Sequence, residues 1–164
     1  MLIYSYFTMD NRVAQVEIIV YKIIKKQPLF LLVKRSPEKG DFWQPITGGA
    51  NENENLIDAA KRELLEETGI KEYKKFLSGV YYFEFDTENY GRLKEYVYGV
   101  EVDKDVDAEL SHEHTEKKWC TIDEALQLLK FDTNKEAFKK LFNQLMIKKL
   151  ILFYENKSFN FSRL

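Results

Sequence analysis

Three glutamates, Glu63, Glu66 and Glu67, are the residues of this 164-residue chain whose spacing points most directly to chemistry. On a helix, positions i, i+3 and i+4 lie on one arc of the surface, so the three carboxylates repel one another unless a cation lies between them. Carboxylate oxygens are hard ligands that suit Mg²⁺ or Mn²⁺. The spacing therefore indicates a divalent-metal site.

The local sequence predicts the helix that these glutamates need, over residues 56–68. Asn55 is a suitable N-cap, Asp58 adds negative charge in the first turn, and Gly69 suits a left-handed residue after the last turn. Beside the glutamates, three- and four-residue steps predict a stripe that packs on a sheet, made of Ile57, Ala60, Leu64 and Thr68.

A glycine-rich turn, Thr47-Gly48-Gly49, precedes this helix. Asn51 and Asn53 follow it, and asparagine tolerates left-handed backbone geometry. Such a turn lets main-chain amides and carbonyls approach ions and phosphates, whereas a merely solvated acidic helix has no need of it. We therefore favour a metal- and phosphate-binding loop and helix over a solvated acidic face.

Residues 48–70 fit the pattern G-x5-E-x7-R-E-(apolar)-x-E-E-x-G-(apolar) at every position. This pattern is the Nudix box, and the chain resembles a Nudix pyrophosphohydrolase. The resemblance implies an α/β fold, the α/β/α sandwich around a mixed β-sheet. It also implies metal-assisted attack of water on a phosphoanhydride, which would release a monophosphate and pyrophosphate from a triphosphate.

The resemblance also assigns roles in metal binding and proton transfer. Glu63, Glu66 and Glu67 are expected to hold Mg²⁺, or Mn²⁺ in its place, with help from the main-chain carbonyl of Thr47. One of Glu66, Glu67 and Glu113 is expected to accept the proton of the attacking water. The sequence alone leaves these three open.

Other box positions are expected to build the scaffold rather than to take part in the reaction. Glu54 and Arg62 match the positions of a supporting ion pair in the family. Gly48 and Gly69 are the glycines that open and close the loop and helix. None of these four is expected to be catalytic.

Three segments outside the box resemble the dihydroneopterin triphosphate and dATP pyrophosphohydrolases, namely residues 41–48, 112–119 and 134–138. With the box, the resemblance covers most of residues 12–142. This subfamily has an arginine at the strand end where Arg35 stands, and the planar guanidinium can bond two phosphate oxygens at once. Arg35, Thr47 and Gly48 are therefore expected to bind the substrate.

Glu113 is our choice for a further metal ligand or base, because Nudix enzymes commonly draw one from a loop remote in sequence. Glu116 in the same loop is the competing residue, and a purely solvated loop is the alternative. His112 and His114 also suggest zinc by their spacing. No cysteine or additional histidine completes a four-ligand set, so we do not expect zinc.

The aromatic residues near the box have two interpretations. Trp43 and residues 81–83, Tyr-Tyr-Phe, would stack a purine or pterin ring in one of them. Such side chains more often belong to the core, which we favour. The single cysteine, Cys120, is expected to be buried at a strand end rather than to act as a nucleophile.

The predicted elements alternate strands and helices within one expected domain, residues 1–164. The tail, 150–164, is left unplaced. Strands are predicted over residues 13–24, 29–34, 42–46, 76–85, 93–102 and 118–121, and further helices over 122–129 and 134–149.

Composition narrows the class of protein. A net charge of −2 and a pI near 5.8 argue against a protein that tracks a nucleic-acid backbone. The chain has no stretch long enough to span a membrane, no signal-peptide pattern, and one cysteine, which excludes internal disulfides. We expect a cytoplasmic protein, and homodimer formation, common in the family, is left open.

Three functions remain from the sequence. The first is hydrolysis of a small triphosphate, dihydroneopterin triphosphate or a deoxynucleoside triphosphate. The second is a diadenosine polyphosphate or RNA 5′-end hydrolase, against which Pro45-Ile46-Thr47 counts because those relatives usually have Phe-Pro before the glycine turn. The third is a non-catalytic nucleotide sensor, against which the complete set of box glutamates counts.

Overall fold

A mixed sheet of seven strands forms the centre of the computed structural model, which describes residues 14–88 and 91–161, the last six of these by backbone only. The strand order is β3-β2-β1-β6-β5, with β4 paired to β1 and β7 to β2. The β1–β6 pair is parallel, and the other pairs are antiparallel. The strands are β1 (Ala14–Ile24), β2 (Gln27–Arg35), β3 (Trp43–Gln44), β4 (Ile46–Gly49), β5 (Lys75–Thr87), β6 (Gly91–Glu101) and β7 (His114–Cys120).

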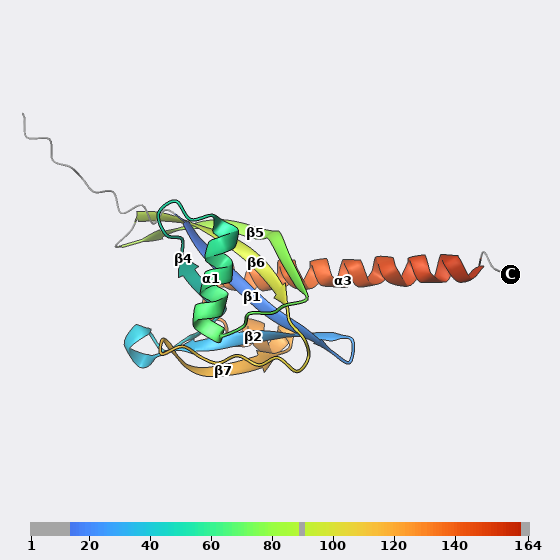
Figure 1. The fold of residues 1–164 in the computed structure, drawn as a ribbon, viewed down its shortest axis with the longest axis horizontal. Helices are drawn as coiled ribbons and strands as arrows, with labels where there is room; N and C mark the ends of the chain where they lie inside the picture. The colour runs from blue at the N-terminus through green and yellow to red at the C-terminus, as the bar shows by residue number, and fades with distance from the viewer. Residues whose placement is uncertain (1–13, 89–90, 162–164) are drawn as a thin grey trace, which may run out of the picture.

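Helices cover both faces of this sheet (Figure 1). Helix α1 (Leu56–Thr68) lies on one face, whereas α2 (Ile122–Leu128) and α3 (Asp132–Phe161) pack on the other. A short 3₁₀ helix, η1 (Pro37–Lys39), follows β2. The predicted α/β/α sandwich with a mixed sheet is confirmed.

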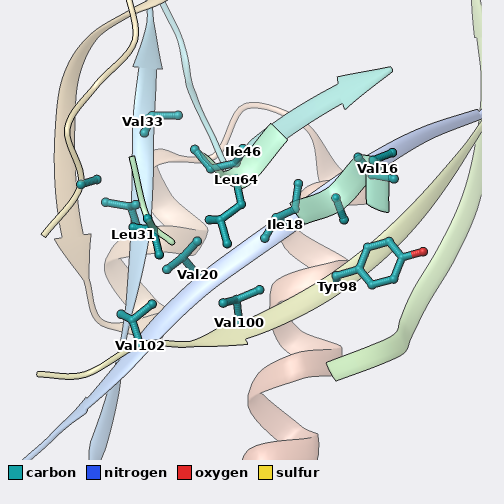
Figure 2. Packing of buried hydrophobic residues seen from close by; sticks show 14 residues of the cluster. Val16, Ile18, Val20, Leu31, Val33, Ile46, Leu64, Tyr98, Val100 and Val102 are labelled. Carbon is teal, nitrogen blue, oxygen red and sulfur yellow. The ribbon is translucent and has the colours of Figure 1, made fainter. Parts of the chain in front are cut away.

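Two apolar clusters hold the layers together. Figure 2 shows the first, in which Ile18 and Val20 of β1 lie close to Leu64 of α1 and Val16 lies further along the strand. In the second, on the opposite face, Ala137, Phe138 and Leu141 of α3 are fully buried. Side chains of β1 alternate between the two clusters, as a strand covered on both faces requires. The central strand therefore reads as a continuous apolar run.

The predicted glycine-rich turn, Thr47-Gly48-Gly49, is instead part of strand β4, which reaches the middle of the sheet because β1 has two partners along one edge. The last part of β1 pairs with β2. The first part of β1 pairs with β4, where Ile18 lies opposite Ile46 and Val16 opposite Gly48. Pro45 separates β3 from β4 and lets the chain cross from the edge of β2 to that of β1. Thr47 and Gly48 are thereby fixed by strand pairing.

Helix α1 has the predicted bounds and caps. The Asn55 side chain accepts a hydrogen bond from the Ile57 amide, and Gly69 has the left-handed φ of 68°. The predicted stripe was wrong at one end, because Ile57 is 38% exposed and Ala59 is buried instead. The buried arc runs through residues 59–60 and 63–64, which leaves Ile57 at its rim.

Several other bounds differ from prediction. The first hairpin needs only Lys25 and Lys26, both with positive φ, so β2 starts two residues early. β7 covers 114–120 rather than 118–121, because its charged residues pair along the edge of β2. Helix α3 covers 132–161, so most of the unplaced tail is helical. The predicted start at residue 13, the turn residues 89–90 and the last residues, 162–164, lie outside the described chain.

Most of the aromatic residues considered for ring stacking, Trp43 and residues 81–83, belong to the core. Trp43, Tyr81 and Phe83 pack against the second cluster, Cys120 is buried there, and Tyr82 is exposed.

The C-terminal part of α3 extends away from the sheet (Figure 1) and exposes Ile147, Leu150, Ile151, Leu152, Phe153 and Tyr154. None of the helices in the described chain has the length and apolarity that crossing a bilayer requires.

A buried carboxyl pair lies beside the second cluster. Glu17 is fully buried and Glu95 is 3% exposed. The Asn134 amide donates a 2.9 Å hydrogen bond to Glu17, whose other oxygen has no partner among the described residues. Burial and the charge of Glu95 raise the pKa of Glu17 well above its usual value. Burial in this pair therefore favours the neutral acid form of Glu17.

Glu17→Gln is expected to make the melting temperature less sensitive to alkaline pH. The raised folded pKa means that the contribution of Glu17 to stability is fully present below the usual value of 4.5 and is lost as the pH rises toward the folded value. Between about pH 5 and about pH 8, the melting temperature of the wild-type protein should fall by at least about 3 °C more than that of the variant. A change of about 1 kcal/mol in the free energy of unfolding gives a shift of this size in a domain of this length. Equal pH dependence in thermal melts would contradict this.

Candidate active site

Arg62 joins the glycine-rich loop to α1. Its Nε and Nη2 lie 2.8 and 2.9 Å from the two Glu54 carboxylate oxygens, and Nη2 also donates to the Gly49 carbonyl at 2.9 Å. These hydrogen bonds, together with one from the Asn51 amide, lower the pKa of Glu54 to about 2. The ion pair expected between Glu54 and Arg62 is thus a bidentate contact. It fixes the loop against the helix.

The same guanidinium lies between two of the three α1 glutamates. Arg62 Nη1 is 2.6 Å from a Glu63 oxygen and 3.1 Å from a Glu66 oxygen. Burial raises the pKa of Glu63 although Arg62 opposes it, and the charges of Glu66 and Glu67 add to the rise. The repulsion that the spacing predicts is therefore real, and a protein cation offsets it here.

The Glu63 carboxyl lies directly against Gly48. A Cβ atom at position 48 would fall 1.9 Å from the Glu63 carboxyl carbon. No side chain fits in that space, so the absence of one at Gly48 is what lets the carboxyl approach the backbone of β4. This contact explains the box glycine by packing rather than by backbone conformation.

Glu67 is held by residues that the sequence analysis did not connect with it. Ser111 Oγ donates to it at 2.5 Å, and His114 Nδ1 lies at an ion-pair distance of 2.9 Å. Burial by itself raises the pKa of Glu67, but the contacts with His114 and Ser111 and the charge of Lys39 outweigh it, so the net shift is downward. Glu67 is thus ionised and fixed in orientation.

The only sequence signal for the contact between Glu67 and His114 is the pair His112 and His114, whose spacing suggests zinc. His114 is the first residue of β7 and is buried, whereas His112 precedes the strand and is exposed. The two rings therefore do not act together. The pairing of β7 with β2 brings His114 to the end of α1, and no local pattern predicts that contact.

Glu113 reaches the same region through Lys39. Lys39 Nζ lies 2.7 Å from the Glu113 carboxylate, and the charge of the same lysine acts on Glu67. The competing residue, Glu116, pairs instead with Lys34 at 3.1 Å on the edge of the sheet. The structure therefore brings Glu113 toward Glu67 and leaves Glu116 apart.

The donor set fits a divalent cation in its chemistry. Within the described residues, no three acidic, histidine or cysteine side chains converge tightly enough to enclose an ion. Glu63 and Glu66 nevertheless accept hydrogen bonds from one nitrogen of Arg62, and Gly48 leaves room for the Glu63 carboxyl against β4. Anionic oxygens clustered around one positive charge are the chemistry that Mg²⁺ or Mn²⁺ requires. The metal roles assigned from the sequence remain predictions.

A pocket of about 690 Å³ opens next to this loop. Arg35 and Thr47, both expected to bind substrate, line it together with Glu95 and Asn134. The Arg35 Nε atom is buried and has no hydrogen-bond partner among the described residues. A buried guanidinium nitrogen without a partner is costly unless a ligand satisfies it. The pocket therefore combines a cationic group with the start of the glycine-rich turn.

The family model of the NUDIX domain matches residues 13–142. This chain belongs to the Nudix family. The asymmetrical bis(5′-nucleosyl)-tetraphosphatase of Rattus norvegicus is 32% identical over 113 residues, 68% of this chain and 76% of that protein. An octanoyltransferase of Myxococcus xanthus is 36% identical over 111 residues, 67% of this chain but only 31% of that protein.

Solved structures agree on the fold. The E. coli dihydroneopterin triphosphate pyrophosphohydrolase matches with a TM-score of 0.70 at 23% identity. The match covers 81% of this chain and 97% of that chain. At this identity the likeness establishes the Nudix fold, and the substrate of that enzyme is a property of that enzyme.

We predict that Mg²⁺ raises the melting temperature of the wild-type protein and that Gly48→Ala removes this rise, because the added Cβ displaces the Glu63 carboxyl. Thermal melts with and without Mg²⁺ measure this. Gly79→Ala is the control, since its Cβ meets no atom within 4 Å but stands at a φ of 67°. That variant should melt earlier and keep its response to Mg²⁺. A normal response in Gly48→Ala would refute the role of the Gly48–Glu63 contact.

Proposed function

We propose that this Nudix protein catalyses Mg²⁺-dependent hydrolysis of a pyrophosphate bond in a small triphosphate. The observation that carries the proposal is the adjacency of two features. The Glu63 carboxyl of α1 lies against Gly48, and the pocket that Arg35 lines is also lined by the preceding residue, Thr47. A triphosphate needs both, because its anionic oxygens repel a nucleophile until positive charge neutralises them.

Glu63, Glu66 and Glu67, with the Thr47 carbonyl, are the residues that would hold the cation. When bound, a divalent ion supplies charge to phosphate oxygens and lowers the pKa of water. Glu63 is kept against β4 by the space at Gly48, and Glu67 is oriented by Ser111. These protein contacts preorganise the carboxylates before substrate arrives.

The proton of the attacking water would pass to Glu66, Glu67 or Glu113. Of these, Glu67 has its orientation fixed by Ser111 and His114, and its lowered pKa keeps it ionised. Glu113 forms an ion pair with Lys39, and the Glu66 side chain is the most exposed of the three. These contacts favour Glu67 as the best-positioned carboxylate.

Arg35 is assigned to the phosphate chain. Its Nε is buried without a partner among the described residues, and it lines the pocket on the side of Thr47. A guanidinium binds phosphate oxygens with two parallel hydrogen bonds, which would satisfy this nitrogen and orient the chain toward α1. Arg35 and the metal site would then hold the phosphates from two sides.

Dihydroneopterin triphosphate or a nucleoside triphosphate is the proposed substrate class. The E. coli enzyme of the same fold acts on the former by its name, and the segments around residues 41–48 and 112–119 resemble that subfamily. A diadenosine polyphosphate is the second candidate, favoured by the 32% identity to the Rattus norvegicus tetraphosphatase. The complete box glutamates support an enzyme over a nucleotide sensor.

Two broader assignments also remain proposals. We place the protein in the cytoplasm, on the composition of the sequence alone. Homodimer formation, common in this family, is best tested by size-exclusion chromatography with light scattering. A mass of 19.5 kDa would indicate a monomer.

Pyrophosphate release should be measured with Mg²⁺ across dihydroneopterin triphosphate, the common nucleoside triphosphates and diadenosine tetraphosphate. We expect the pterin or a nucleoside triphosphate to be hydrolysed fastest, and chelation of the metal to abolish the reaction. Preference for diadenosine tetraphosphate, detected through its mononucleotide products, would favour the second candidate. Tight binding without any hydrolysis would support the sensor and refute the proposal.

Glu66→Gln is expected to reduce kcat/KM with Mg²⁺ by about 100-fold or more, because it removes one anionic oxygen ligand and keeps the shape. Glu72→Gln is the matched control. Glu72 is exposed just beyond α1, so this variant loses the same charge outside the site. Full activity of Glu66→Gln would exclude the metal assignment.

A further inference from the structure

The pocket beside Arg35 has walls suited to a flat ring. Four phenylalanines line it, and they form two contacting pairs. Phe42 and Phe131 meet edge to face at 5.3 Å between ring centroids, and Phe83 and Phe85 lie 6.0 Å apart. Aromatic walls favour a planar, polarisable ligand, and about 690 Å³ is enough for a bicyclic heterocycle with a sugar-like linker.

A buried carboxyl lies in the same pocket. Glu95 of β6 lines it although only 3% of the residue is exposed, and its register partner on β1 is Gln15, another lining residue. Burial raises the pKa of Glu95 to about 7. A ligand that donates hydrogen bonds to both oxygens would favour the ionised form and offset the cost of burying it.

The hydrogen bond between Asn134 and Glu17 influences which polar atoms of Asn134 face the pocket. The Asn134 amide nitrogen donates to Glu17 at 2.9 Å, which turns the carbonyl oxygen of Asn134 away from Glu17, and Asn134 also lines the pocket. Amide oxygens and carboxylates accept hydrogen bonds. Glu95 and Asn134 therefore favour a ligand that presents N–H donors to them.

We propose that this pocket selects a head group with a 2-amino-4-oxopyrimidine edge, as in guanine or a pterin, and that Glu95 reads it by accepting hydrogen bonds from the ring N–H and the exocyclic amino group. That edge presents two parallel donors to the two carboxylate oxygens. Adenine presents one donor beside a ring nitrogen acceptor, which would face the carboxylate with a lone pair. The inference rests on the proposed function only for the direction of the phosphates, toward Arg35 and Thr47.

Wild-type protein alone gives a first test. Inosine nucleotides differ from guanosine nucleotides by the missing exocyclic amino group. Binding of non-hydrolysable GTP, ITP and ATP analogues with Mg²⁺, measured by calorimetry, should show the GTP analogue about 10-fold or more ahead of the ITP analogue, as expected for a hydrogen bond to a charged group. Equal affinities of the GTP and ITP analogues would overturn the proposal.

Glu95→Gln gives a second test, because glutamine offers one acceptor and one donor and so matches adenine instead. The ratio of GTP to ATP analogue affinities should fall by about 10-fold or more, with a gain in ATP analogue affinity. Glu101→Gln, on the same strand but paired with Lys75 outside the pocket, should leave the ratio unchanged. An unchanged ratio in a folded Glu95→Gln protein would overturn the proposal.

These binding measurements separate the inference from the proposed hydrolysis. Guanine-selective binding without pyrophosphate release would contradict the proposed function and leave the role of Glu95 standing. Pyrophosphate release with no preference among guanine, hypoxanthine and adenine would support the proposed function and contradict the role of Glu95.

Discussion

The contact of Arg62 with its acidic neighbours is the interaction on which the rest of the site depends. One helix carries Glu63, Glu66 and Glu67 on a single arc, an arrangement that is unstable without a nearby cation. Arg62 bonds the first two and also holds Glu54 and the Gly49 carbonyl. The same side chain thus keeps the loop folded and the carboxylates together. The proposed metal site therefore depends on this arginine for the position of its carboxylates.

The sheet brings this loop to the substrate pocket. Because β1 pairs with β2 along one part and with β4 along another, Thr47 and Gly48 enter the interior beside Glu17 instead of ending at an edge. The Glu63 carboxyl lies against Gly48 of β4, and the neighbouring Thr47 lines the pocket near α3.

Local signals in the sequence predicted the parts of the site that are contiguous in the chain. The caps of α1 and the positions of Glu63, Glu66 and Glu67 follow from helix geometry. The contact of Glu67 with Ser111 and the burial of Glu95 could not be predicted, because both depend on strand pairings between distant segments. Strand alternation gives Glu95 a face of the sheet but does not say whether a helix covers that face.

Binding of Mn²⁺ in the absence of substrate, followed by electron paramagnetic resonance, tests the central claim most directly, because it asks whether the α1 carboxylates hold a divalent ion. The account predicts saturable binding to the wild-type protein and to Glu72→Gln, and at least about 10-fold weaker binding to Glu63→Gln, which loses one charged ligand. Equal Mn²⁺ affinity of Glu63→Gln and the wild-type protein would contradict it.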